Sequence, residues 1–168
     1  MADDIINRVA NSKLITFDLE DYYPEGERVL FDIKDWLFEE IVLKEKDFRS
    51  HVEQHDWSQY QDKYVAITCS SDAIIPAWAF MIVSIALEPY TKYNITGNLE
   101  DLETALYQSI IANLDISDFS DKPIIIKGCS KKPVPLKAYS MITNKLKPVV
   151  KSIMFGEACS NVPLFKRK

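Results

Sequence analysis

Glycine is scarce in this sequence and long hydrophobic runs are absent, and each absence excludes a class of function. Only four glycines occur among the 168 residues, and no glycine-rich loop of the kind that cradles a phosphate or a dinucleotide is present. We therefore do not expect nucleotide chemistry. The longest apolar stretch, residues 73–87, contains Pro76 and Ser84 and is shorter than the ~20 residues that span a bilayer. We expect no membrane residence, and we expect this stretch to form a helix buried in a core.

The amino terminus lacks the features of a secretion signal. It carries Asp3 and Asp4 where a signal peptide has basic residues, and no apolar segment follows them. A cytoplasmic protein is therefore expected. Cysteine is also scarce, since only three occur, and disulfides are rare in a reducing compartment. Free thiols or metal ligands are the expected roles for an odd number of cysteines.

Charge is distributed unevenly along the chain. The net charge of −5 argues against general nucleic-acid binding. Residues 1–60 carry an excess of acidic side chains, whereas residues 122–168 are strongly basic and contain a single acid, Glu157. Either the two regions neutralise each other, or an acidic partner or an anion docks on the basic region. In the second case Lys131 and Lys132 would lie near the docked group.

The first part of the chain is expected to differ in structure from the rest. No low-complexity segment, long linker or clean repeat divides the sequence, so we expect a single α/β domain over residues 1–168. Residues 1–60 should hold a short helix, a β-hairpin with Pro and Gly in its turn, and a second helix. The expected helices cover residues 3–10 and 45–56, and the hairpin strands cover residues 14–19 and 28–33.

Residues 61–168 are expected to form a βαβ-type core, because strand-like and helix-like segments alternate along them. Strands joined by right-handed crossovers run parallel and share one carboxyl edge. The expected fold class is therefore α/β, with a mostly parallel sheet flanked by helices and an N-terminal β-hairpin or antiparallel edge. Strands are expected at residues 64–68, 92–96, 123–127 and 152–155, and helices at residues 76–87, 99–114 and 136–150.

Each of the three cysteines is followed by serine and stands at or beyond the end of a strand-like run. Cys129 and Cys159 extend this pair to the same phrase, Cys-Ser-x-x-Pro. If the strands are parallel neighbours, then Cys69, Cys129 and Cys159 all lie at one edge of the sheet, where open α/β folds bind their ligands. The sequence thus predicts a site at this edge.

Metal binding is the leading interpretation of this site. Thiolates are soft ligands that suit zinc or an iron–sulfur cluster, and such a centre needs about four donors. His55 is the first candidate for the fourth donor, with Asp72 and Glu157 behind it. His51 and His55 share a helix face, although their polar surroundings also fit a solvated helix end. No Cys-x-x-Cys pair supports the metal site, and small cysteines at strand ends also pack as weak hydrophobes.

Two other functions stay open. Cys69 or Cys129 could be the nucleophile of a cysteine-dependent enzyme or a sulfur carrier, because a predicted helix follows each of them and helix amino termini stabilise thiolates. No histidine lies near either cysteine in the sequence. The third reading is an interaction scaffold without chemistry. The sequence does not predict the oligomeric state.

Four phrases of the sequence stand out, at residues 15–28, 56–60, 69–76 and 155–166. They resemble an uncharacterised bacterial family that is known only as a domain of unknown function. The resemblance covers nearly the whole chain and brings no activity, ligand or catalytic residue. It implies a genomic context, in which genes of this kind lie near those of the sulfur-mobilisation (SUF) system for iron–sulfur assembly. That context favours a metal or sulfur role and a protein partner in iron–sulfur assembly.

Overall fold

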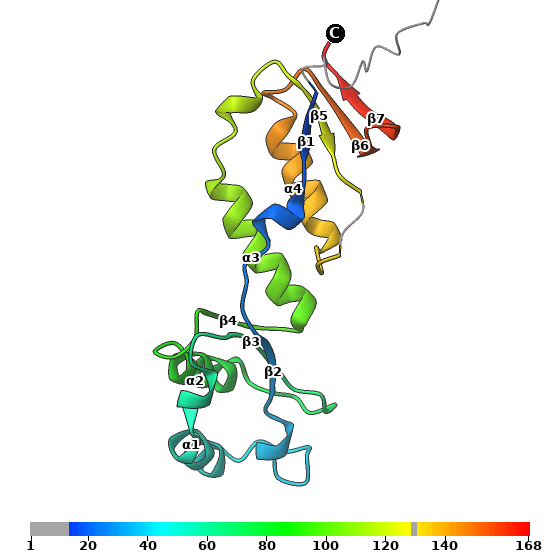
Figure 1. Cartoon of the computed structure of the whole chain (residues 1–168). Helices are drawn as coiled ribbons and strands as arrows, with labels where there is room; N and C mark the ends of the chain where they lie inside the picture. Colours follow the sequence, from blue (N-terminus) through cyan, green and yellow to red (C-terminus); the bar gives the residue numbers. More distant parts are fainter. Residues whose placement is uncertain (1–13, 129–130) are drawn as a thin grey trace, which may run out of the picture. The chain divides into compact units, whose positions relative to one another are not determined.

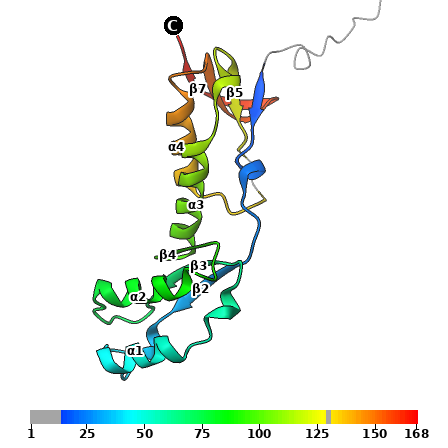
Figure 2. The same cartoon turned by 90° about the vertical axis from the view of Figure 1, so that its left-hand side faces the viewer.

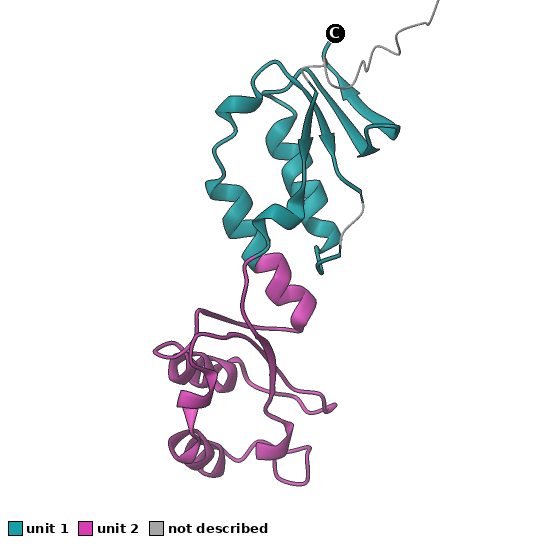
Figure 3. Cartoon of the chain, viewed as in Figure 1, with its two compact units in different colours: residues 1–23, 106–168 teal, residues 24–105 magenta. Residues whose placement is uncertain are grey.

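The computed structural model describes residues 14–128 and 131–168. The chain folds into two compact units, which Figure 3 shows in different colours. Unit 2 comprises Pro24–Ala105, and unit 1 comprises the segments on both sides of it, Met1–Tyr23 and Leu106–Lys168. The chain therefore begins unit 1, builds the whole of unit 2, and then returns to complete unit 1.

Unit 1 contains a four-stranded sheet in the order β1-β5-β6-β7 (Figure 1). The first three strands are parallel, and β7 pairs with β6 in the antiparallel direction. Helix α4 and the second half of helix α3 lie on one side of this sheet (Figures 1 and 2). The elements are β1 (Ile15–Phe17), α3 (Leu99–Asn113), β5 (Pro123–Ile126), α4 (Leu136–Leu146), β6 (Ser152–Glu157) and β7 (Ser160–Lys166).

The core of unit 1 forms where α4 packs on the central strand. Ala138, Ile142 and Leu146 recur every four residues, so they lie on one helix face, and all three are fully buried. They pack in the same cluster as Ile124 and Ile126 of β5. This spacing of apolar residues fixes which face of α4 meets the sheet.

Unit 2 contains a three-stranded parallel sheet in the order β2-β3-β4. Helices α1 and α2 lie on one side of it (Figure 2). The core contains Phe48 of α1 and the β3 residues Val65 and Ile67, all fully buried. The elements are β2 (Arg28–Asp32), α1 (Glu45–Gln54), β3 (Tyr64–Thr68), α2 (Ala77–Leu87) and β4 (Tyr93–Thr96).

The two units repeat one structural pattern at a constant spacing along the sequence. In each unit a short 3₁₀ helix leads into the central strand, a helix of the same length follows, and a parallel neighbouring strand comes next. The buried α4 residues Ala138, Ile142 and Leu146 have equivalents in α2, which are also fully buried. These α2 equivalents are Ala79, Val83 and Leu87.

The backbone repeats as closely as the core. The amide of Asp62 donates to the carbonyl of Tyr90 over 2.8 Å, and the amide of Asp121 donates to the carbonyl of Val149 over 3.1 Å. Both aspartates adopt left-handed backbone conformations, with φ of 59° and 54°. Each therefore turns the chain into its central strand in the same way, which supports the interpretation of the units as copies of one pattern.

The α/β class and the mostly parallel strands are confirmed, but two details of the expected sheet are wrong. The strands form two sheets, and the N-terminal strands do not form a hairpin, because β1 pairs with β5 while β2 pairs with β3. The antiparallel edge is instead the C-terminal strand β7. The sequence shows no clean repeat, whereas the structure contains one.

Three further expectations concern the number of domains, the N-terminal helix and membrane-spanning helices. The single domain over residues 1–168 stays a prediction, although its two units have separate core clusters. The helix expected at residues 3–10 lies outside the described residues. None of the described helices is both long and apolar enough to cross a membrane.

Candidate functional site

A pocket of about 320 Å³ lies at the carboxyl ends of β3 and β4 in unit 2, and Cys69 is part of its wall. Cys69 directly follows β3 and is half-buried. Its Sγ atom lies 3.2 Å from the hydroxyl oxygen of Ser71, within hydrogen-bonding distance. The pocket is lined by Ile67, Thr68, Cys69, Ser71, Ala73, Ile75, Phe80, Thr96 and Gly97.

The loop that carries Cys69 is fastened by the carboxylate of Asp32. The amide of Ser70 donates to Asp32 Oδ1 over 3.1 Å, and the amide of Lys34 donates to the same oxygen over 3.0 Å. Burial raises the pKa of Asp32, but hydrogen bonds from Ser70 and Lys34 outweigh it, so the pKa lies below its usual value. Asp32 is therefore ionised at neutral pH and holds the loop beside the thiol.

The walls of the pocket combine hydroxyl groups with apolar surface. Thr68, Ser71 and Thr96 carry hydroxyls, whereas Ile75 and Phe80 are apolar. No lysine, arginine or histidine is among the lining residues. The pocket therefore suits a small neutral or sulfur-containing group rather than a highly charged anion.

Cys159 lies elsewhere, in the turn between β6 and β7 of unit 1, and it is exposed. The prediction that the three cysteines lie at one edge of one sheet is therefore wrong, because Cys69 follows a strand of the other sheet. Cys129 lies outside the described residues. Its neighbour Gly128 is close to β6, since a Cβ atom on Gly128 would come within 3.5 Å of Gly156 Cα.

Unit 1 fastens the loop that follows Cys129 with a different carboxylate. Glu20 Oε1 accepts a hydrogen bond from the amide of Lys132 over 2.7 Å and also accepts one from the amide of Lys131. In each unit, an acid near the end of the first strand thus binds the backbone of the loop after the central strand. In the sequence, a Cys-Ser pair follows the central strand of each unit, and the pair of unit 1 lies outside the described residues.

His55 belongs to an aromatic cluster in unit 2. Its Nε2 atom lies 3.0 Å from the hydroxyl of Tyr60, and its ring centroid lies 4.6 Å from that of Trp57. Burial lowers the pKa of His55, and the charge of Asp56 opposes this only in part. The ring is therefore mainly neutral at neutral pH, and its role as a metal ligand stays a prediction.

The other candidate ligands do not gather around these residues. Asp72 and Glu157 are both exposed, and they belong to unit 2 and unit 1, respectively. Within residues 14–128 and 131–168, no group of three or more His, Cys, Asp or Glu side chains is placed to hold a metal ion. Metal binding by Cys69, Cys129, Cys159 and His55 stays a prediction.

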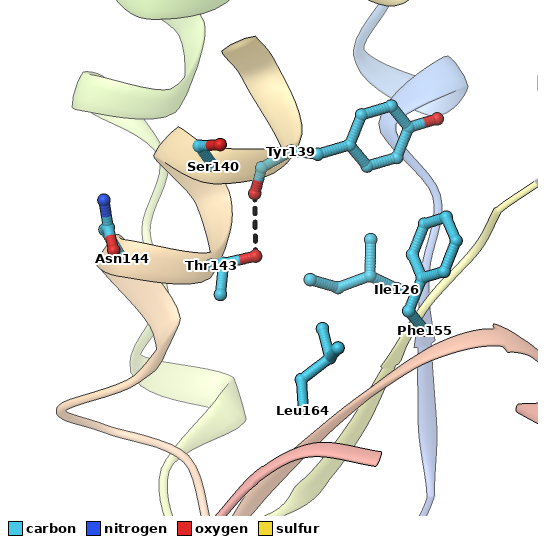
Figure 4. A pocket seen from close by; sticks show the side chains of 7 residues that line it. All are labelled: Ile126, Tyr139, Ser140, Thr143, Asn144, Phe155 and Leu164. Atoms are coloured by element: carbon cyan, nitrogen blue, oxygen red, sulfur yellow. Dashed lines mark hydrogen bonds between the residues drawn. The ribbon is translucent and has the colours of Figure 1, made fainter. Parts of the chain in front are cut away.

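Sequence reasoning missed a second kind of hollow, which recurs in both units beside the central helix. In unit 1 it is a groove of about 390 Å³ between α4 and the strands β6 and β7, seen from close by in Figure 4. Its lining residues are Ile126, Tyr139, Ser140, Thr143, Asn144, Phe155 and Leu164. The equivalent groove in unit 2 measures about 460 Å³ and is lined by Ala77, Phe80, Met81, Ser84, Ile85 and Thr96.

Comparison with known proteins places the chain in a family by sequence. The fold defines an α/β protein built from two similar units, and the family model described as "Protein of unknown function (DUF2480)" matches residues 3–167. The chain belongs to this family. Searches of curated proteins and of solved structures gave no match.

Proposed function

We propose that the protein accepts and carries sulfur, with the thiol of Cys69 as the acceptor. The observation that carries this proposal is the position of the Cys69 Sγ atom in the wall of a pocket, 3.2 Å from the Ser71 hydroxyl. A single thiol in a pocket fits a nucleophile or carrier better than it fits a metal centre, which needs about four donors. The sulfur donor would be a protein partner in iron–sulfur assembly, the context that the family resemblance implies.

The transfer needs no oxidant if the donor is a persulfide, R–S–SH. The thiolate of Cys69 attacks the outer sulfur, the new Sγ–S bond forms, and the S–S bond of the donor breaks. The donor leaves as the thiol R–SH after taking up the proton that Cys69 gave up. The hydroxyl of Ser71 can donate a hydrogen bond to the sulfur that carries the negative charge.

Cys69 is not a position at which the two units carry the same residue. Many of the positions that the two units share have a visible structural purpose, such as the buried residues Ala79 and Ala138 or the turn residues Asp62 and Asp121. At the spacing that relates Ala79 to Ala138, Cys69 corresponds to Gly128, so the Cys-Ser pairs that follow the two central strands are out of register by one residue. In unit 2 Cys69 packs against the core and also lines a pocket, so its half-buried side chain has an open side.

The test compares two variants that each keep one thiol of known position. One variant keeps Cys69 and the other keeps exposed Cys159, with the remaining cysteines replaced by serine. Each is treated with a small persulfide donor and then with a dilute thiol that removes accessible persulfide. Mass spectrometry should find the added sulfur retained on Cys69, which the pocket shields, and lost from Cys159. Equal loss from both, or no uptake by Cys69, would contradict the proposal.

Zinc or iron–sulfur binding is the second candidate, and one observation favours it. Gly128, which precedes Cys129 in the sequence, lies close to β6, and the carboxyl end of β6 leads into the turn with Cys159. Two thiols of unit 1 could then share a metal. Anaerobic purification of the wild type and of Cys129→Ser, with metal analysis and absorption spectra, tests this. Metal content that the substitution leaves unchanged would remove Cys129 from the ligands.

A further inference from the structure

Helix α2 lies at the edge of unit 2 and exposes an apolar surface there. Of its eleven residues, only Ser84 is polar and none is charged. Its inner face is buried, but Met81 and Ile85 on the outer face are 62% and 71% exposed. Ala77, one turn earlier, is exposed as well. Ala77, Met81 and Ile85 form the outer α2 stripe, and a helix that is apolar on all sides is normally covered on all sides.

The sheet edge beside this stripe is open. Strand β4 is the last strand of its sheet, and within the described residues no other strand pairs with its outer side. Its sequence, Tyr-Asn-Ile-Thr, contains neither charge nor proline. Proteins usually protect an exposed edge with such residues, because its free backbone groups pair readily with another strand.

Unit 1 shows how the same edge looks when it is covered. Strand β6 occupies the place of β4, and β7 pairs with it along its outer side. Leu164 of β7 reaches the groove beside α4 (Figure 4). β7 is then the last strand of this sheet, and it carries Pro163 as well as Lys166.

The outer faces of α2 and α4 differ in polarity, in agreement with the difference between their sheet edges. The α4 residues equivalent to Met81 and Ile85 are Ser140 and Asn144, which are polar and suited to water. In unit 1 the sheet edge is covered and this part of the helix face is polar, whereas in unit 2 the edge is open and the helix face is apolar. The two features of unit 2 therefore point to one covering partner that meets both.

We propose that this partner is a second copy of the same chain, joined by antiparallel pairing of β4 with β4. A two-fold axis perpendicular to the sheet brings a strand against itself in the antiparallel direction. The same axis sets the two α2 helices side by side on one face of the continuous sheet, so each outer α2 stripe covers the other. Neither β4 nor the stripe carries a charge, so two copies meet without electrostatic repulsion. The inference is independent of the thiol site.

A single partner strand would satisfy this surface less completely. It could pair with β4 as β7 pairs with β6, and it could place one apolar side chain in the groove as Leu164 does. A second copy supplies both a strand edge and an apolar helix face. The geometry therefore favours self-association over the binding of an isolated strand.

Sedimentation of the full-length chain over a range of concentrations tests the proposal. The wild type should dimerise, and the variant Met81→Glu/Ile85→Glu should be monomeric, because it places charge in the contact. The matched control is Ser140→Glu/Asn144→Glu, which changes the equivalent positions of unit 1 and should remain dimeric. A wild type that is monomeric at every concentration, or a control that dissociates equally, would overturn the proposal.

A cross-linking experiment keeps the test valid if the charged variant fails to fold. Ile85→Cys, in a chain whose three native cysteines are serine, should form a covalent dimer under mild oxidation. The matched variant Asn144→Cys should stay monomeric under the same conditions. Equal cross-linking of the two variants would contradict the proposed contact.

Discussion

Units 1 and 2 are built on the same pattern and differ mainly at one edge. Both have a central strand followed by a helix with three fully buried residues in equivalent places, and both use an acid to fasten the loop after that strand. In unit 1 the outermost parallel strand is covered by β7, whereas no strand of the described residues covers β4 of unit 2. The common features explain the fold, and the difference locates the surface that is available for a partner.

The comparison also separates the two kinds of hollow. The pocket that contains Cys69 lies at the carboxyl ends of the strands, where α/β folds commonly bind ligands. The grooves beside α2 and α4 run along the helices. What fills each groove depends on the strand that pairs with the neighbouring sheet edge, as Leu164 of β7 does beside α4. The two hollows of unit 2 adjoin each other, since Phe80 and Thr96 line both of them.

The largest expected effect comes from truncating an equivalent core residue in each unit. Leu87 and Leu146 are both fully buried, and replacing a buried leucine by alanine costs about 2–5 kcal/mol. Because the two core clusters share no residue, Leu87→Ala should lower amide protection in unit 2 and leave unit 1 largely protected, and Leu146→Ala should do the reverse. Hydrogen exchange resolved by residue measures this.

The outcome decides how far the units are independent. Equal loss of protection in both units after either substitution would mean that they unfold together as one cooperative domain, which is the expectation from the sequence. In that case the separate cores would still be present but would not be separate folding units.

A smaller effect is expected from pH, and it should be confined to unit 2. Burial lowers the pKa of His55, whereas the equivalent position in unit 1 is Leu114. The folded chain then binds the proton less readily than the unfolded chain. This contribution to stability is complete above the ordinary histidine pKa of about 6.5 and is lost as pH falls below it.

Tryptophan fluorescence can follow this change, since Trp36, Trp57 and Trp78 all belong to unit 2. Urea unfolding monitored by fluorescence should shift to lower urea as pH falls through that range. The variant His55→Phe should lose that part of the pH dependence. If the variant keeps the same dependence on pH as the wild type, the proton acts at another group.

Local structure was predictable from the sequence, because it depends on nearby residues. The strand expected at residues 64–68 is β3, and the helices expected at 76–87 and 99–114 are α2 and α3 to within a residue at each end. Strand pairing was not predictable, because the strands are short and carry no signal that selects a partner far along the chain. β1, for example, pairs with β5, although the whole of unit 2 lies between these two strands in the sequence.

Neither the repeat nor the surface formed by the outer α2 stripe and the β4 edge could be predicted from the sequence, and the reasons are related. Equivalent core positions keep their apolar character but not always their identity, as Val83 and Ile142 show. The stretch at residues 73–87 was expected to form a helix buried in a core, and the exposed side chains of Met81 and Ile85 show that only one face of the helix is buried. The absence of charged residues in α2 was a signal in the sequence, because such a helix needs cover on every face. Only the structure shows that this cover is lacking on the side of the open β4 edge.

Amide hydrogen exchange of β4 and β6 at two protein concentrations tests the central claim most directly. These strands are equivalent, and among the strands of residues 14–128 and 131–168 only β6 has an outer neighbour. Protection of β4 should rise with concentration as a second copy covers its outer edge, while protection of β6 should be high and constant. Protection of β4 that does not depend on concentration would contradict the account.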